Sequence, residues 1–189
     1  MKLSLLAPAG SLRQKFGGEV LRPGVAAVPE PLVLGWEEWV ALPELGLPAI
    51  KAKVDTGART SALHAFYVEG YGPMRARMVR FGVHPIPRRA DVAVECKARI
   101  IDWRVIVSSN GEREQRYVIE TPIRIGEREW PIEVTLTNRD TMAYRMLLGR
   151  QAIERGVLVD PSSSFRQPKL RYKVYGVGTP SSRRGRGEG

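Results

Sequence analysis

The strongest structural signal in this chain is Lys51-Ala-Lys-Val-Asp55-Thr-Gly-Ala-Arg-Thr-Ser-Ala-Leu-His64. Apolar and charged residues alternate from Ile50 to Val54, which is typical of a strand with one buried face. This strand leads directly into Asp55-Thr56-Gly57, a turn-like tripeptide. Asp-Thr-Gly alone is a weak signal, because a chain of this length contains it by chance in roughly one case in ten. Its position directly after an alternating strand makes it informative.

The rest of the middle of the chain also favours strands. Runs with strand character cover residues 36–42, 49–54, 62–68, 77–81, 92–107, 116–125 and 130–137. Asn110-Gly111 lies between two of these runs and suits the two positive φ values of a tight hairpin turn. Only residues 150–155 favour a helix, which Gly156 would end. The pattern predicts an all-β domain over residues 31–162 with one short C-terminal helix.

The two ends of the chain differ from this domain in composition. Residues 1–30 contain Gly and Pro without a sustained period, which predicts a flexible N-terminal extension. Residues 163–189 end in an Arg-, Gly- and Ser-rich run, which predicts a basic, disordered tail. The apolar stretch in the first nine residues is too short for a signal peptide. We therefore expect a cytoplasmic protein.

The charge and the cysteine content limit the possible partners and the cellular compartment. The 30 Lys and Arg residues exceed the 20 Asp and Glu residues by ten, and residues 160–189 alone account for +5. Because the middle of the chain is nearly balanced, the charge leaves nucleic acid only as a minor partner of the tail. No apolar run approaches the roughly 18 to 20 residues of a membrane-spanning helix. The single cysteine, Cys96, excludes an intrachain disulfide and fits a reducing compartment.

Several common catalytic motifs are absent from the sequence. It contains no His-Glu-x-x-His, no Gly-x-x-x-x-Gly-Lys-Ser/Thr loop and no Gly-x-Ser-x-Gly elbow. Its two histidines, His64 and His84, could form a zinc site with Cys96 and a carboxylate such as Glu95. Nothing in their spacing requires zinc, so we expect no cofactor and keep the metal site as an alternative.

A second informative segment is Met146-Leu-Leu-Gly-Arg150, which directly precedes the expected helix. Combined with Asp55-Thr56-Gly57, it resembles the retropepsins, the aspartic proteases of the retroviral type. The resemblance is closest to a bacterial branch long labelled "ATP-dependent zinc proteases", and it covers roughly residues 33–162. Further matching segments are Gly35-Trp36-x-x-Trp39-Val40-x-Leu42-Pro43, His84-Pro85, Arg116-Tyr117-Val118-Ile119 and Leu136-Thr137-Asn138-Arg139-Asp140.

This resemblance implies a closed β-barrel of the acid-protease type and an aspartic endopeptidase activity of the EC 3.4.23 type. Such an enzyme needs two carboxylates that share one proton. The chain has one Asp-Thr-Gly, and Asp160-Pro161-Ser162 is not a second copy. The resemblance therefore implies a homodimer in which each protomer contributes Asp55.

The resemblance also implies roles for residues around Asp55. Thr56 would hydrogen-bond across the dimer axis, and Gly57 would permit close backbone approach. Leu147, Leu148 and Gly149 would pack beneath the catalytic loop, with Arg150 after them. Residues 108–114, including Asn110 and Gly111, are the candidate flap over the substrate.

One departure from the retroviral pattern concerns charge. The position four residues after Asp55 is often acidic in those enzymes and pairs with the arginine equivalent to Arg150. Here it is Arg59, so Arg150 needs another partner, for which Asp140 and Glu154 are candidates.

Arg59 and Arg139 could instead face the cleft and form a cationic rim that favours acidic substrates, with Ala58 as a further substrate-binding candidate. Members of the branch are associated with enzymes that add glutamates to the C-terminus of a small-subunit ribosomal protein, so a glutamate-rich tail is the expected substrate. The alternatives are a zinc protease that uses His64 and His84, or a β-barrel binding module whose basic tail contacts RNA.

Overall fold

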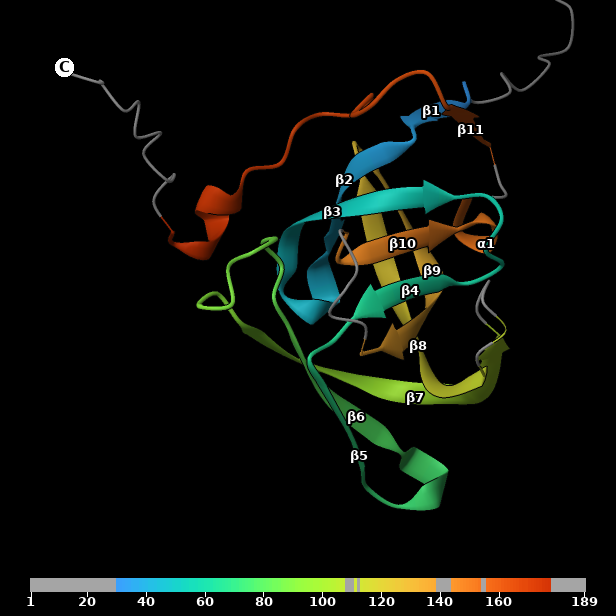
Figure 1. Cartoon of the computed structure of the whole chain (residues 1–189), viewed down its shortest axis with the longest axis vertical. Coiled ribbons are helices and arrows are strands. Elements are labelled where there is room, and N and C mark those ends of the chain that lie inside the picture. The colour runs from blue at the N-terminus through green and yellow to red at the C-terminus, as the bar shows by residue number, and fades with distance from the viewer. Residues whose placement is uncertain (1–29, 108–110, 112, 139–143, 154–155, 178–189) are drawn as a thin grey trace, which may run out of the picture.

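The computed structural model describes residues 30–107, 111, 113–138, 144–153 and 156–177. Nearly all regular structure in this part of the chain is β-sheet, as predicted (Figure 1). The strands are β1 (Leu32–Gly35), β2 (Glu37–Leu42), β3 (Leu47–Asp55), β4 (Ser61–His64), β5 (Tyr67–Tyr71), β6 (Met78–Val83), β7 (Val94–Val107), β8 (Arg113–Ile125), β9 (Arg128–Thr137), β10 (Met146–Gly149) and β11 (Val157–Asp160). The α-helix is α1 (Arg150–Ile153), and the 3-10 helices are η1 (Pro43–Leu45), η2 (Met74–Ala76) and η3 (Tyr172–Tyr175).

The large sheet closes on itself through a pairing between β2 and β8. Its order is β2-β3-β10-β4-β9-β8-β7-β6-β5, and Ala41 of β2 also pairs with Arg124 of β8. This pairing joins β2, β3, β10, β4, β9 and β8 into a ring around the core. Fully buried side chains fill the ring, among them Ile50, Leu63 and Met146. A ring without free edges buries apolar residues on one face of every strand, which explains the alternation of β3.

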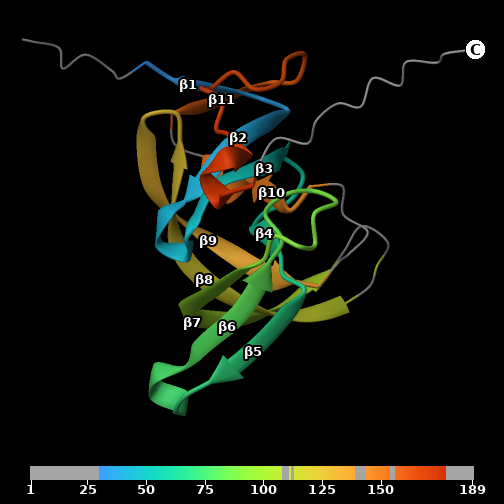
Figure 2. The same ribbon diagram turned by 90° about the vertical axis from the view of Figure 1, so that its left-hand side faces the viewer.

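The remaining strands extend this ring. Strand β6 pairs with β5 on one side and with the first half of β7 on the other, and β5 and β6 project from the barrel as an arm (Figure 2). Strands β1 and β11 form a separate parallel pair at the opposite end. None of the described helices has the length and hydropathy that spanning a membrane requires.

The C-terminal segment differs from the sequence-based expectation. Residues 163–177, which we call the C-terminal strap, lie against the barrel, although the composition predicted disorder from residue 163. The backbone N–H of Phe165 donates to the Glu37 carbonyl at 2.9 Å, and the Tyr175 hydroxyl donates to the Ala49 carbonyl at 2.8 Å. The strap packs because its aromatic residues alternate with the basic ones that dominated the composition. Residues 178–189 and 1–29 lie outside the described residues.

Glu38 holds the first part of the strap against the barrel. This carboxylate is fully buried at the edge of the barrel and accepts backbone N–H groups from Gly35, Arg166 and Gln167 at 2.8, 2.7 and 3.3 Å. A buried carboxylate requires several such donors to compensate for its lost hydration. Glu38 thereby ties the end of β1 to the strap.

Candidate active site

The candidate catalytic residue, Asp55, is the last residue of β3 and is partly buried at the mouth of a cleft. Its Oδ1 accepts the backbone N–H groups of Gly57 and Ala58, both at 3.1 Å. Among the described residues no donor contacts Oδ2. One carboxylate oxygen is therefore fixed by its own loop, and the other is available for a ligand or for a second carboxylate.

Strand β10 supports this loop from below. It runs parallel to β3, with Gly149 in register with Asp55, and antiparallel to β4. A Cβ atom on Gly149 would lie 2.6 Å from the Thr60 carbonyl carbon and 2.9 Å from the Ser61 nitrogen. Only glycine permits this close backbone approach, which accounts for the glycine in Leu-Leu-Gly. Leu148 is buried, whereas Leu147 is half-buried and lines the cleft.

Ser61, the first residue of β4, links β10 to the catalytic loop and to β9 by hydrogen bonds. Its buried hydroxyl accepts the Gly149 N–H at 3.1 Å, and its carbonyl accepts the Thr135 hydroxyl at 3.0 Å. Buried groups of this kind must be paired, so they fix the distance between β4, β9 and β10. Sequence reasoning did not single out Ser61 or Thr135, because a serine or threonine in a strand carries no distinctive signal.

Arg150 contacts backbone carbonyl groups of the catalytic loop. Its guanidinium Nη1 lies 3.5 Å from the carbonyl oxygens of Thr56 and Gly57, and its backbone N–H donates to the Ala58 carbonyl at 2.9 Å. Among the described residues, the partners of Arg150 in this loop are thus carbonyl groups. Asp140 and Glu154, the partners considered from sequence, lie outside the described residues.

The cleft in front of Asp55 has a volume of about 1020 Å³. One wall is the catalytic loop, including Gly57, Ala58 and Arg59. The opposite wall is the end of β7, where the consecutive residues Arg104–Val107 all line the cleft. Arg116 of β8 and Thr135 of β9 line the cleft as well, so neighbouring strands of the sheet form this wall.

The cationic side chains of the cleft differ in how far they are neutralised. Arg104 is paired with Asp102 and Glu133, and the hydrogen bonds that it donates, first to Glu133 and then to Asp102, raise its pKa. Arg116 is buried and paired with Glu114 at 2.6 Å. Arg59 is exposed, and no carboxylate among the described residues pairs with it. Arg59 therefore carries most of the uncompensated positive charge at the cleft.

Comparison with known proteins places this geometry in a family. A sequence profile described as "Retropepsin-like aspartic endopeptidase RimB" matches residues 33–170. The chain belongs to the RimB-like family. The match includes the barrel, the Asp55 loop, β10 and the first part of the C-terminal strap.

Individual relatives of this RimB-like chain are larger proteins. It is 50% identical over 133 residues to a protein named probable alpha-L-glutamate ligase from Shewanella pealeana, a match that covers 70% of this chain and 29% of the relative. A protein of the same name from Parasynechococcus marenigrum is 48% identical over 140 residues, covering 74% and 30%. The chain thus spans less than a third of the curated relatives it matches.

A solved structure supports the fold of the RimB-like chain. Protein Lpg0085 of unknown function, from Legionella pneumophila, superposes with a TM-score of 0.60 at 29% identity. The match covers 71% of this chain and 97% of that protein.

The remaining sequence-based candidates occupy different places in this RimB-like domain. The Thr56 side chain is exposed. Gly111 adopts φ +84° in the connection between β7 and β8, whose pairing extends to Val107 and Arg113. Asn110, most of the proposed flap and Arg139 lie outside the described residues.

The two histidines do not form a metal site with other described residues. His64 is buried within β4, whereas the His84 ring stacks on Phe66 with centroids 4.2 Å apart and places Nδ1 3.1 Å from the Val92 carbonyl oxygen. In the described part of the chain, no three His, Cys, Asp or Glu side chains are grouped to hold a metal ion. Cys96 is buried and contacts the Leu45 carbonyl. These contacts favour structural roles for both histidines.

Proposed function

We propose that this chain is one half of an aspartic peptidase, in which two protomers bring their Asp55 carboxylates together around one water molecule. The observation that supports this most is the state of Asp55: one oxygen is held by two loop N–H groups and the other is available at a large cleft. At Asp160, by contrast, both carboxylate oxygens accept hydrogen bonds from its own loop.

Asp160, the other candidate carboxylate, is not suited to catalysis. Its Oδ1 accepts the N–H and hydroxyl of Ser162, its Oδ2 accepts the Ser163 hydroxyl, and it does not line the cleft. Among the described residues, Asp55 is thus the one carboxylate that lines the cleft, and an aspartic dyad needs a second from another copy.

The chemistry of such a dyad follows from the proximity of two like charges. Two carboxylates in contact cannot both ionise, so they share one proton and titrate as a unit. The ionised Asp55 takes a proton from the bound water as it attacks the peptide carbonyl carbon. The protonated Asp55 of the other protomer donates to the carbonyl oxygen, and breakdown of the tetrahedral intermediate transfers a proton to the leaving amine.

The edge of β7 gives a physical reason for a peptide substrate. The first half of β7 pairs with β6 and the second half with β8. One edge of Arg104–Val107, a segment that lines the cleft, therefore has no partner strand among the described residues. An extended peptide can add to such an edge through backbone hydrogen bonds. This addition would hold a peptide bond in front of Asp55 without depending on side-chain identity.

The substrate class we propose is a glutamate-rich polypeptide. Arg59 supplies positive charge at the cleft mouth, and the curated relatives that contain a similar domain are named glutamate ligases. The matched segment spans less than a third of those proteins, so the ligase name describes the larger protein. A peptidase for glutamate-rich tails would act on the kind of product that a glutamate ligase makes.

The test is hydrolysis of a peptide that ends in a run of glutamates, followed by mass spectrometry, with wild-type and Asp55→Asn protein. The asparagine cannot act as a base, so cleavage should fall by at least about a thousandfold. Asp160→Asn is the matched control and should cleave at the wild-type rate. Undiminished cleavage by purified, metal-free Asp55→Asn protein would show that the active site lies elsewhere.

Subunit mixing tests the dyad independently. If wild-type and Asp55→Asn chains are mixed in equal amounts and allowed to exchange, only about a quarter of the dimers carry two Asp55 residues. Activity per total protein should fall to about a quarter, whereas independent active sites would retain half.

A further inference from the structure

A second cavity lies on the outer face of β2 and β3, away from the catalytic loop. It has a volume of about 710 Å³ and is formed by three parts of the chain: strands β2 and β3, the loop that includes Ile86 and Arg89, and the C-terminal strap. In Figure 1 the red η3 turn and the green loop after β6 lie on the same side of the barrel as the start of β3. We call this cavity the basic pocket.

The name reflects the charges that line the pocket. Its lining includes five cationic side chains and no carboxylate: Lys51, Arg89, Lys169, Arg171 and Lys173. Arg89 is neutralised by Asp91, with contacts of 2.7 and 2.6 Å. The three cations of the strap are exposed, and no carboxylate among the described residues forms an ion pair with them. A cluster of like charges raises the local positive potential and attracts anions.

Aromatic packing holds these charges in place. The Trp39 ring is covered by Tyr172 at a centroid distance of 4.9 Å and by Phe165 at 6.1 Å. The Lys51 ammonium lies 5.3 Å from the Trp39 centroid and 4.7 Å from the Phe165 centroid. The cation–π contacts fix the Lys51 side chain at the floor of the pocket without neutralising its charge.

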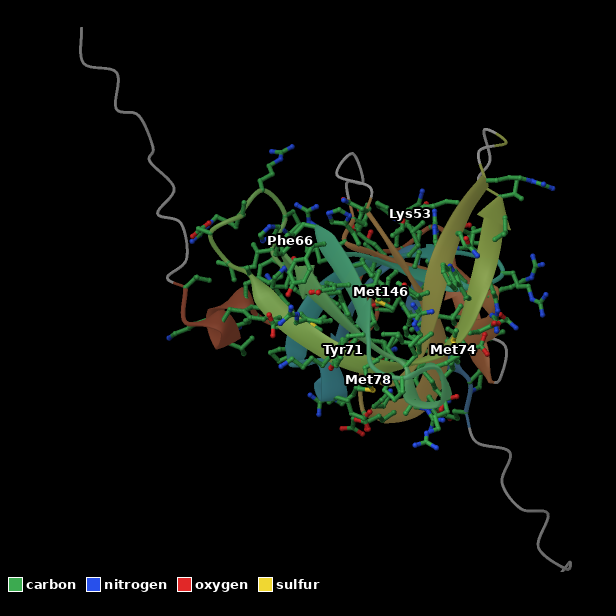
Figure 3. All side chains as sticks on the ribbon, turned by 90° about the horizontal axis from the view of Figure 1, so that it is seen from below. Lys53, Phe66, Tyr71, Met74, Met78 and Met146 are labelled. Carbon is green, nitrogen blue, oxygen red and sulfur yellow. The ribbon has the colours of Figure 1, made fainter. Side chains whose placement is uncertain are left out.

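The basic pocket is connected to the catalytic cleft by one face of β3. Lys51, Lys53 and Asp55 alternate with the buried residues Ala52 and Val54, so their side chains share the outer face. Lys51 lines the basic pocket and Asp55 lines the cleft. Figure 3 shows Lys53 between the reddish η3 turn and the β7–β8 hairpin. At the rise of a strand, Lys51 and Asp55 are about 13 Å apart, the span of roughly four extended residues.

We propose that the basic pocket is an exosite that binds acidic side chains of the same polypeptide that is cleaved at Asp55. The inference deepens the proposed function and rests on it for the position of the scissile bond. An extended acidic chain would leave the cleft along β3, pass Lys53 and place its carboxylates against the cations of the strap. Charge-assisted contacts of this kind select acidic sequences without restricting the residues at the cleaved bond.

The same pocket is poorly suited to single-stranded nucleic acid. Binding of unpaired bases depends on exposed aromatic faces on which the bases stack. Here Trp39 is only 5% exposed, and Tyr172, Phe165 and Lys51 already cover its ring. The cations of the basic pocket are therefore better suited to an acidic peptide than to RNA.

The first experiment measures binding alone. Full-length Asp55→Asn protein, which leaves the peptide intact, is titrated into a fluorescent oligoglutamate peptide of about ten residues, an oligoglutamine peptide and an oligouridylate RNA. The exosite variant adds Lys169→Gln, Arg171→Gln and Lys173→Gln. It should bind oligoglutamate roughly tenfold more weakly, since each exposed charge contact contributes up to about a fivefold effect.

The matched control removes the same charge from exposed positions on the distant arm, with Arg75→Gln, Lys97→Gln and Arg99→Gln. It should alter the affinity by less than about twofold. Equal weakening by both sets would show a general charge effect and overturn the exosite. Selective loss of RNA binding in the exosite variant would also overturn it, in favour of a nucleic-acid site. These binding results do not depend on whether Asp55 is catalytic.

The second experiment measures peptide cleavage in the wild-type background. The strap substitutions should raise KM for a long acidic substrate and leave kcat unchanged, because they touch no reacting group. A substrate with fewer than about four residues on the exosite side of the cleaved bond cannot reach Lys51, so its KM should not change. Equal effects on short and long substrates would contradict the proposal.

Discussion

Replacement of Gly149 by alanine gives the most direct test of how the barrel positions Asp55. The added Cβ would lie 2.6 Å from the Thr60 carbonyl carbon, 2.7 Å from the Thr60 oxygen and 2.9 Å from the Ser61 nitrogen. Ordinary contacts of a Cβ begin near 3.4 Å, so the overlap is close to 0.8 Å. All three atoms belong to the backbone, and no change of rotamer can relieve the clash.

Relief therefore requires that β10 and the start of β4 separate or that the catalytic loop moves. Pairing of Leu147 with Ala62 and of Met146 with Leu63 resists the separation. Overpacking of this kind costs about 1–3 kcal/mol. We expect the urea midpoint of unfolding to fall with an unchanged m-value, because the surface exposed on unfolding stays the same.

Peptidase activity should fall further than stability. A shift of the loop by a fraction of an ångström moves Asp55 relative to its partner, and misplacement of about 1 Å can cost about a hundredfold in rate. Activity should be measured at a urea concentration and temperature at which both proteins are fully folded, so that kcat reports on geometry alone.

Gly176→Ala is the matched control. Gly176 has φ +73° and no atom within 4 Å of an added Cβ, so the substitution adds backbone strain of about 1–2 kcal/mol without a clash. It should lower stability and leave kcat intact. A Gly149→Ala protein with wild-type stability and full activity would refute the idea that close packing of β10 positions Asp55.

Three further predictions concern single side chains. Arg150→Ala should lower kcat with little change in KM. It should lower the free energy of unfolding by less than about 1 kcal/mol, because the contacts of Arg150 with the Thr56 and Gly57 carbonyls are long and exposed. Steady-state kinetics and urea unfolding measure the two effects, and a change in KM alone would contradict the prediction. Burial raises the pKa of Cys96 to about 12, so iodoacetamide at pH 8 should leave the native thiol unmodified and label it only after unfolding, as followed by mass spectrometry. Hydrogen bonds, first from the Ser162 side chain, lower the pKa of Asp160 from 3.8 to about 2. The ionised Asp160 therefore stabilises the fold fully above about pH 4, and this stabilisation is lost as the pH falls toward 2. The melting temperature of Asp160→Asn should vary less with pH over this interval than that of the wild type.

The sequence was most informative where local patterns and chain geometry coincide. Alternation in β3 predicted a strand with a buried face, and Asn110-Gly111 predicted the connection between β7 and β8. Leu-Leu-Gly carried information because Gly149 must approach the backbone of Thr60. The all-β fold could therefore be predicted before any pairing was known.

Contacts between residues distant in sequence were not predictable in the same way. Composition marked residues 163–177 as a basic tail, because a charge count does not register Phe165 and Tyr172 between the cations. The partners of the strap, Trp39 and Glu38, lie more than a hundred residues earlier in the chain. Likewise, the contact of Arg150 with the loop carbonyls follows from the pairing of β10 with β3, which no local pattern specifies.

Strand β3 illustrates how one short element can serve both proposed sites. Its inner face, including Ile50, Ala52 and Val54, packs in the core of the barrel and so fixes the orientation of the strand. Its outer face then necessarily aligns Lys51, Lys53 and Asp55 at intervals of about 7 Å, because the side-chain period of a strand is two. A polypeptide extended beside this face repeats with the same period, so every second acidic side chain would meet the same row of charges. The alternation that first indicated a strand is thus also the feature that would link cleavage at Asp55 to recognition of an acidic chain.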